Sequence, residues 1–95
     1  MILVKIHQGV VAVCDKDLIG KTISDENLEI QITERFYGGE EKSEEELLNI
    51  LQDAHNINII GKESIKFVLK HRFVSEENII YIGDVPHAQI VEVNL

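Results

Sequence analysis

Alternating hydrophobic residues at the start of the chain predict two strands. Ile2, Val4 and Ile6 are each separated by one residue, and after Gln8-Gly9 an apolar run covers residues 10–14. Glycine permits the tight turn of a β-hairpin, and an uninterrupted apolar run is typical of a strand that is covered on both faces. We therefore expect a β-hairpin whose second strand is buried.

The next segments predict a third strand and a first helix. Apolar and polar residues alternate over residues 28–33, as in a strand with one buried face. Ser43, with Glu46 three positions later, matches a capping box, which marks the start of a helix. Apolar residues then recur at helical spacing until His55-Asn56, so this helix is expected to bury one side.

A further strand and a second helix follow. Residues 57–60 predict a short apolar strand that Gly61 ends, and apolar residues at helical spacing from Lys62 predict a helix that closes near Arg72. Phe67 lies off the apolar stripe of this helix, so we expect it to be exposed. An exposed aromatic side chain would be a hint of contact with a partner chain.

Two final strands complete the expected order. Residues 79–82 and 88–93 predict strands, with a loop of residues 83–87 between them. Pro86 is expected in this loop or at a sheet edge because it cannot donate a hydrogen bond to a sheet ladder. The order β-β-β-α-β-α-β-β indicates an α+β or α/β protein with one mixed sheet of five to six strands and two main helices. A chain of 95 residues supports one core, so residues 1–95 are expected to form a single domain.

The middle of this order brings three loops together. A strand–helix–strand–helix–strand series favours parallel strands joined by right-handed crossovers, and ligands usually bind beyond the carboxyl ends of such strands. The loops after the strands at residues 28–33, 57–60 and 79–82 would meet at that edge. The binding residues predicted at or beside it are Tyr37, Gly38, Gly39, Glu40, Gly61, Lys62, Pro86, His87 and Gln89.

Composition and charge narrow the classes of function. With 44% hydrophobic and 27% charged residues, the chain has the balance of a globular protein. Nine Lys and Arg against 17 Asp and Glu give a net charge of -8, which argues against non-specific nucleic-acid binding by the whole surface. A single cysteine fits a reducing compartment, and neither a signal peptide nor a membrane span is apparent, so we expect a cytoplasmic protein without membrane contact.

The second predicted helix carries a basic strip. Lys62, Lys66 and Lys70 recur every four residues with Arg72 close behind, and residues 61–74 contain four Lys and Arg against one Glu. Such a patch can meet the phosphates of RNA or a ribonucleoprotein although the protein as a whole is acidic. The alternative is that Lys70 and Arg72 complement the helix C-terminus and the rest is solvated surface. Lys62 differs because it lies at the helix start, where exposed N–H groups can hold an anion.

A few polar residues are candidates for chemistry. His87 is the candidate for proton transfer, because imidazole titrates near neutral pH. Tyr37 could stack on a base, although a tyrosine there more often closes the end of a core. Cys14 is expected to be an inert buried thiol, and the scattered histidines predict no metal site. Gly20-Lys21-Thr22 matches the tail of a phosphate-binding loop, but Asp15 stands where the first glycine is required, so nucleotide binding by this motif is rejected while nucleotide binding elsewhere stays open. No cofactor is predicted.

Four blocks of the chain resemble an archaeal family. They are Val13-Cys14-Asp15 to Leu18-Ile19-Gly20-Lys21, Phe36-Tyr37-Gly38-Gly39-Glu40, Asn58-Ile59-Ile60-Gly61 and Val85-Pro86-His87-Ala88-Gln89. In order and spacing these blocks are similar to the family known only as domain of unknown function 424. The resemblance implies a stand-alone archaeal cytoplasmic protein and carries over no activity, cofactor or catalytic residue.

Three hypotheses of function follow from these residues. The first is a small binding module for RNA or the translation machinery, with Lys62, Tyr37 and His87 at the contact edge. The second is a small enzyme, or an anion- or small-molecule-binding domain, that uses the same edge with His87 as acid or base. The third is a structural or oligomeric subunit, in which Phe67 and an edge strand are buried against a partner chain.

Overall fold

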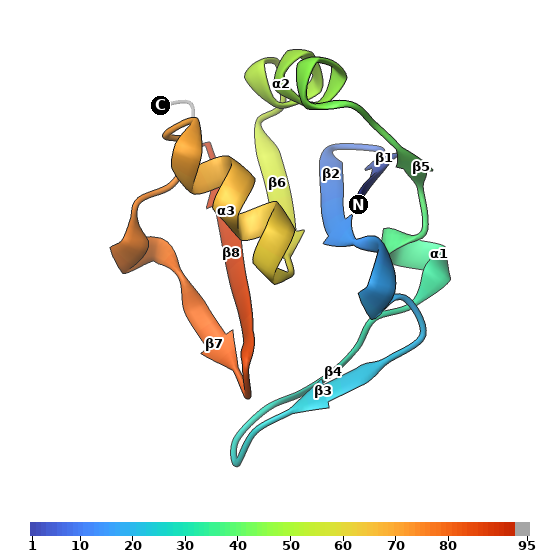
Figure 1. Cartoon of the computed structure of the whole chain (residues 1–95), viewed down its shortest axis with the longest axis vertical. Coiled ribbons are helices and arrows are strands. Elements are labelled where there is room, and N and C mark those ends of the chain that lie inside the picture. The colour runs from blue at the N-terminus through green and yellow to red at the C-terminus, as the bar shows by residue number, and fades with distance from the viewer. Residues whose placement is uncertain (93–95) are drawn as a thin grey trace.

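A six-stranded sheet forms the centre of the computed structural model, which describes residues 1–92 (Figure 1). Its strands lie in the order β5-β1-β2-β6-β8-β7. Their bounds are β1 (Ile2–His7), β2 (Val10–Asp15), β5 (Glu40–Glu41), β6 (Asn56–Ile60), β7 (Ile80–Ile82) and β8 (Val85–Val91). Parallel and antiparallel neighbours both occur, so the predicted mixed sheet of five to six strands is confirmed.

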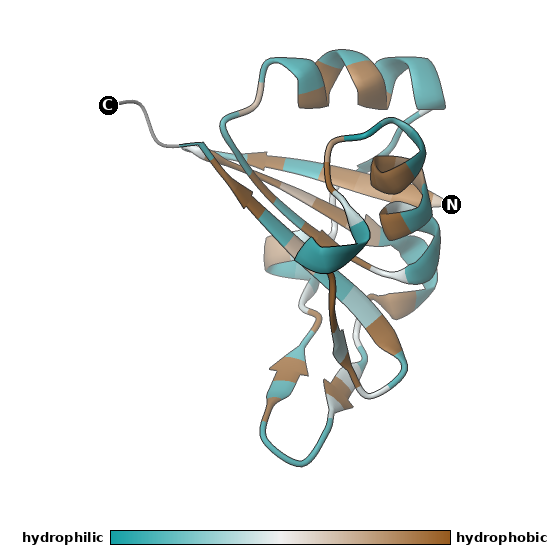
Figure 2. Ribbon diagram, turned by 90° about the vertical axis from the view of Figure 1, so that its left-hand side faces the viewer, coloured by the Kyte–Doolittle hydropathy of each residue, from teal (hydrophilic) through white to brown (hydrophobic). Residues whose placement is uncertain are grey.

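Two main helices cover one face of the sheet. They are α2 (Glu44–Gln52) and α3 (Lys62–Lys70), and the predicted capping box of Ser43 and Glu46 opens α2. Figure 2 shows hydrophobic residues alternating with hydrophilic ones along the strands. The side chains buried between helices and sheet include Leu47, Leu51, Ile65, Val68, Val13, Ile57, Ile59 and Ala88. This layer is the larger core.

Phe67 belongs to that core, which makes the expectation of an exposed position wrong. Its surface is 4% exposed, and its ring lies 4.6 Å from the His71 ring between centroids. Ile2 of β1 and Phe67 line the same hollow beside α3. The buried side of α3 is therefore wider than the apolar stripe that the spacing of its residues indicates. The exposed aromatic that suggested a partner chain is therefore absent at this position.

Short elements cover the opposite face of the sheet. They are η1 (Lys16–Leu18), β3 (Thr22–Ser24), β4 (Glu29–Gln31) and α1 (Glu34–Tyr37), and η2 (Glu76–Asn78) precedes β7. The third predicted strand, at residues 28–33, is shorter than expected and lies outside the main sheet, paired with β3 in a ribbon that projects below it in Figure 1. Ile32 is fully buried just after this ribbon, against Ala12 and Cys14 of β2. The alternation of apolar and polar residues over residues 28–33 thus belongs to a ribbon that packs over the main sheet.

Strand directions differ from the predicted series of parallel crossovers. β2 and β6 are parallel, but β8 is antiparallel to both β6 and β7 and lies between them. The reason is the short connection at Gly83-Asp84, where Gly83 has a φ of 61°, a conformation that folds β8 directly back along β7. The expected parallel series of the strands at residues 28–33, 57–60 and 79–82 is therefore wrong, because β4 lies outside the main sheet and β8 separates β6 from β7.

Pro86 lies inside β8 and not in the loop predicted over residues 83–87. Its carbonyl accepts a hydrogen bond from the Gly61 N–H at 3.0 Å, past the end of β6. In an antiparallel strand the nitrogen and carbonyl of one residue point to the same side, so the missing N–H faces a place where the ladder has ended. The proline thus costs the sheet no hydrogen bond. The predicted end of this strand at Val93 lies outside the described residues.

Asp15, the last residue of β2, joins the central strands to α3. Its carboxylate accepts hydrogen bonds from the Glu63 N–H at 3.0 Å, the Ser64 N–H at 2.8 Å and the Ser64 hydroxyl at 2.7 Å. These donors belong to the first turn of α3, whose N–H groups have no partner within the helix. Gly61, with a φ of 117°, is pressed against this carboxylate, and a Cβ there would lie 2.3 Å from its carbon. The site leaves room only for glycine.

The end of α3 is an αL cap formed by arginine. Arg72 has a φ of 61°, its N–H donates to the Leu69 carbonyl, and the Phe73 N–H donates to the Val68 carbonyl. This pattern is a Schellman motif, in which glycine is the preferred residue because side chains are strained at positive φ. Arg72 thus carries a conformational cost within the fold.

Replacing Asp15 tests the junction between β2 and α3. We expect Asp15→Ala to lower the free energy of unfolding by about 2 to 4 kcal/mol, because it removes a charged acceptor from three donors. Urea denaturation measures this change. Asp17→Ala, an exposed acidic position two residues away, is the matched control and should stay within about 0.5 kcal/mol of the parent protein. Equal stability of the two variants would contradict the assigned role.

Replacing Arg72 tests the strained cap. We expect Arg72→Gly to raise the free energy of unfolding by about 0.5 to 1 kcal/mol, because glycine adopts the positive φ without strain. Arg72→Ala removes the same charge but keeps a Cβ, so it should not stabilise the protein. Thermal and urea unfolding of both variants provide the comparison, and equal effects would show that the backbone is relaxed at this residue.

Candidate functional site

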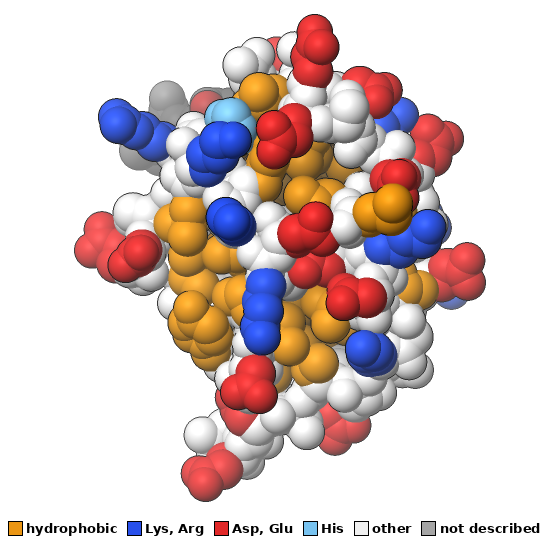
Figure 3. Space-filling view, viewed as in Figure 1, with side chains coloured by type: hydrophobic (Ala, Val, Ile, Leu, Met, Phe, Trp, Pro, Cys, Tyr) orange, Lys and Arg blue, Asp and Glu red, His pale blue; other side chains and the backbone are white. Residues whose placement is uncertain are grey.

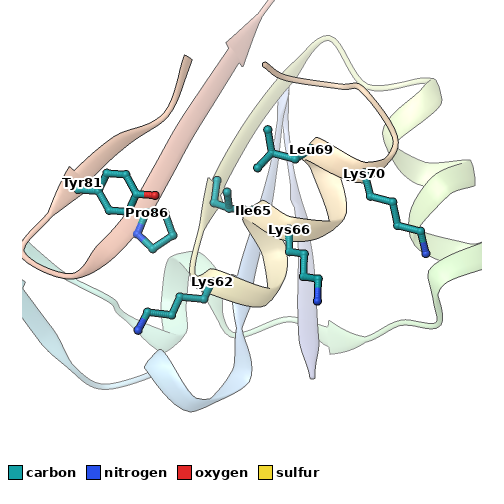
Figure 4. Close-up of a pocket in the computed structure, with 7 residues that line it drawn as sticks. All are labelled: Lys62, Ile65, Lys66, Leu69, Lys70, Tyr81 and Pro86. Carbon is teal, nitrogen blue, oxygen red and sulfur yellow. The ribbon is translucent and has the colours of Figure 1, made fainter. Parts of the chain in front are cut away.

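A groove of about 610 Å³ lies between α3 and the β7–β8 hairpin, here called the α3 groove (Figure 4). It is lined by Lys62, Ile65, Lys66, Leu69, Lys70, Tyr81 and Pro86. Ile65 and Leu69 extend from α3 toward the hairpin, where Tyr81 and Pro86 lie beside each other (Figure 4). The floor of the groove is therefore apolar.

Three lysines form the rim of the α3 groove. Lys62 extends toward the hairpin, whereas Lys66 and Lys70 project from the solvent side of α3 (Figure 4). Within residues 1–92 none of the three forms a salt bridge, although Glu44 and Glu63 line a hollow on the other side of Lys66 and Lys70. Figure 3 shows basic side chains in a row beside the hydrophobic surface. This rim can meet an anionic ligand.

Tyr81 gives the groove an exposed aromatic ring. Its surface is 64% exposed, and it lies opposite Pro86 in the β7–β8 pairing. Because the Pro86 carbonyl is directed to Gly61, Tyr81 and Pro86 exchange no backbone hydrogen bond, and side chains are closest in such pairs. The buried proline ring therefore supports the tyrosine ring from behind.

The predicted binding residues are divided between the two faces of the sheet. Lys62 and Pro86 line the α3 groove. His87 and Gln89 alternate with Pro86 along β8 and so point to the opposite face, where Tyr37 is buried. The contact edge expected from Lys62, Tyr37 and His87 is therefore not formed.

Tyr37 closes the end of a core, which was the alternative to stacking on a base. It is 6% exposed, its hydroxyl donates to Asn58 Oδ1 at 2.7 Å, and its ring meets Phe36 edge to face. Burial, followed by the nearby Cys14, raises the pKa of Tyr37 to about 12. A ring held in this way is not available to stack on a ligand.

His87 is held by the neighbouring strand. Its Nδ1 lies 2.8 Å from the Ile59 carbonyl, which can only accept, so Nδ1 carries the proton and Nε2 has the lone pair in the neutral ring. His87 pairs with Ile60 in the sheet, and Gln89 pairs with Asn58. Within the described residues no carboxylate is hydrogen-bonded to His87, and the Ile59 carbonyl is the group that fixes the orientation of its ring.

The segment Gly38-Gly39-Glu40 lies across the sheet from the α3 groove, beside β1. A Cβ on Gly39 would lie 1.9 Å from the Val4 carbonyl oxygen, so this glycine is required by close backbone packing. Glu40 is exposed and forms a 3.0 Å salt bridge with Lys42. These residues therefore shape the sheet edge where β5 pairs with β1.

The N-terminus of α3 already has an anion. The N–H groups of Glu63 and Ser64, which an external phosphate or carboxylate would need, donate to Asp15. From the sequence, no structural role was predicted for Asp15, which stands where a phosphate-binding loop would require glycine. Its role as a cap could not be found from spacing, because it is 48 positions from Glu63 along the chain. Lys62 can meet a ligand only through its side chain.

Cys14 is buried between the sheet and its cover. Burial, followed by the charges of Asp15 and Asp17, raises the pKa of the Cys14 thiol to about 12. Its Sγ donates to the Asp15 carbonyl at 3.2 Å. A protonated thiol in this setting is a poor nucleophile.

The described part of the chain has neither a cluster of metal ligands nor a membrane-spanning helix. No group of three His, Cys, Asp or Glu side chains among residues 1–92 is placed to hold a metal ion. No helix in the same range has the length and apolar character needed to span a membrane.

Three residues of the groove were not predicted as site residues from the sequence. They are Ile65 and Leu69, which form its floor, and Tyr81, which supplies its exposed ring. Tyr81 was assigned only to a strand. A usable signal was its place in the middle of a short strand close to Pro86 in sequence, because a hairpin between them would set the two rings opposite each other.

The fold and the groove together define a small α+β protein with an apolar groove rimmed by lysines. The chain matches the family described as "Protein of unknown function (DUF424)" over residues 5–93, and it belongs to that family. It is also similar to the crystal structure of an uncharacterized conserved protein from Methanopyrus kandleri, with a TM-score of 0.79 and 26% identity over 99% of this chain and 95% of that chain. No curated protein matches it.

Thiol labelling tests the environment of Cys14. We expect almost no reaction with iodoacetamide in the folded protein at about pH 8, because a pKa of about 12 leaves roughly one thiolate in ten thousand. The same thiol should react readily in denaturant, where its pKa returns to the ordinary value. Mass spectrometry after timed labelling measures both rates, and fast labelling under native conditions would contradict the buried position.

Proposed function

We propose that this protein is a small RNA-binding module that contacts RNA, alone or in a ribonucleoprotein such as the translation machinery, through the α3 groove. The supporting observation is that three lysines, which form no salt bridge within residues 1–92, and an exposed tyrosine surround one groove of a protein with net charge -8. Lysine attracts the phosphate backbone, and aromatic rings accept bases. Both groups occur together at this groove.

Lys62 is the most informative of the rim residues. It is the first residue of α3, where the helix dipole disfavours a cation, and no carboxylate within residues 1–92 forms a salt bridge with it. Lys70, in contrast, lies in the last turn, where a cation stabilises the helix. The fold therefore accounts for Lys70 but not for Lys62, and a bound phosphate would account for both.

The acidic remainder of the surface restricts how RNA can bind. Like charges repel the backbone wherever the local charge is negative, so only the basic rim offers a favourable approach. Three phosphate contacts on a single strand give a salt slope of about -2, since each contributes about 0.7. Binding is thus expected to be weak and sensitive to salt.

A second candidate ligand is a small anionic molecule with an apolar part. The volume of about 610 Å³ favours it, because this value falls in the range of small-molecule sites. RNA is preferred because Lys66 and Lys70 project outward along the helix and do not converge in the groove, an arrangement that suits an extended anion.

Removing rim charges tests the proposal. We expect the full-length protein to bind a short single-stranded oligouridylate, and the variant Lys62→Gln/Lys66→Gln to bind it about 3- to 30-fold more weakly, because two exposed charge contacts are lost. Fluorescence anisotropy between about 50 and 200 mM salt should show a slope reduced by about 1.4.

A matched double variant is the control for this experiment. Lys16→Gln/Lys21→Gln changes the net charge equally at exposed lysines outside the α3 groove, so it should retain the parent affinity. Equal losses in both double variants, or no binding of the oligonucleotide by the parent protein at low salt, would overturn the proposal. Binding of uridine monophosphate as tightly as the oligonucleotide would favour the small-anion alternative.

A further inference from the structure

We infer that the α3 groove selects single-stranded RNA by stacking one unpaired base on Tyr81, with little preference for the identity of that base. This inference rests on the proposed function and adds the class of RNA and the residue that selects it. Lysines alone would bind the phosphates of a duplex and of a single strand, so the selection must come from the aromatic ring.

The position of Tyr81 suits stacking. β7 is one of the two edge strands of the sheet, and Tyr81 is 64% exposed there, with the buried Pro86 opposite it on β8. An aromatic ring fixed by a neighbour loses little side-chain freedom when a base lies on it. Tyr37, the other tyrosine of the chain, is buried and hydrogen-bonded, so among the described tyrosines only Tyr81 can serve.

The groove places apolar and charged groups on either side of such a base. Ile65 and Leu69 of α3 face Tyr81 across the floor, where they can contact the edge of a base or a ribose (Figure 4). Lys62 extends from the start of α3 toward the hairpin, and Lys66 follows one turn further along. A strand whose base lies on Tyr81 therefore has a lysine near its backbone.

The lining side chains carry no planar amide, guanidinium or carboxylate group with which to read a base edge. Specific readout uses such groups in planar hydrogen-bonded pairs with the base, or a lysine directed at guanine, and here Lys66 and Lys70 project to the solvent side of α3. The lining residues are lysine, isoleucine, leucine, tyrosine and proline, so the Tyr81 hydroxyl is the one uncharged polar side-chain group among them. Every base has a flat face, so stacking on Tyr81 accepts all four.

A duplex cannot use this contact. Its bases are stacked on each other and paired, so presenting one to Tyr81 would require unstacking at a cost of a few kcal/mol. A duplex would retain only the phosphate contacts with the lysine rim. The groove should therefore distinguish the two forms of RNA through Tyr81.

Oligonucleotides with and without bases test the inference on the full chain. The probes are a single-stranded oligouridylate, the same backbone with abasic sites, and a blunt RNA duplex, each titrated into the parent protein, Tyr81→Ala and Tyr81→Phe by fluorescence anisotropy. We expect Tyr81→Ala to weaken oligouridylate binding about 5- to 150-fold and Tyr81→Phe to leave it nearly unchanged, because phenylalanine also stacks. Tyr81→Ala should leave abasic and duplex binding unchanged.

Other results of these titrations would overturn the inference, the proposed function or both. If the parent protein binds oligouridylate and loses it in Lys62→Gln/Lys66→Gln, but Tyr81→Ala binds normally, the inference is overturned and the RNA-binding proposal stands. If the parent protein binds no RNA, both are overturned. A preference of more than about tenfold among homopolymers would overturn the lack of base preference. Sedimentation is the final check, since a dimer that Tyr81→Ala dissociates would show that the ring covers a second copy of the chain.

Discussion

The hydrogen bonds that the Asp15 carboxylate accepts from the first turn of α3 are the interaction on which the rest of the structure depends. They attach the end of the central strand β2 to a helix that begins much later in the chain, and they require glycine at position 61 because no Cβ fits beside the carboxylate. The Gly61 N–H is then directed to the Pro86 carbonyl. One buried carboxylate thus fixes α3 and β8 relative to each other, and the α3 groove is the space left between α3 and the hairpin that β8 forms.

The same interaction explains why the groove meets anions through side chains and not through the backbone. A helix N-terminus usually offers N–H groups to a phosphate, but here they are used inside the protein. Lys62 follows directly and projects toward the hairpin. Charge on the rim is thereby combined with the exposed ring of Tyr81. In the proposed function the two would contribute differently, since lysines give long-range attraction and a ring gives a short-range contact that depends on the shape of the ligand.

Local patterns predicted the elements well where neighbours along the chain decide the structure. The capping box at Ser43 depends on residues three positions apart, and it opens α2 as expected. The expectations failed where distant groups decide. Phe67 is buried because it packs within the larger core against groups distant in the sequence, and Pro86 is accepted within β8 because β6 ends beside it. Residues 28–33 alternate as a strand does, but the pattern does not distinguish a sheet strand from a ribbon packed over the sheet.

The sequence by itself determined the mixed sheet, its two main helices, the row of lysines on α3 and the family, because these follow from periodicity, capping and motif order within short stretches. Only the tertiary structure decided that β8 lies between β6 and β7, that Tyr37 and His87 face away from Lys62, and that Tyr81 lies opposite Pro86. The physical reason is that strand order and the choice of sheet face depend on pairing between distant segments. A shift of one residue in such pairing moves every side chain to the other face, and no local pattern fixes that choice.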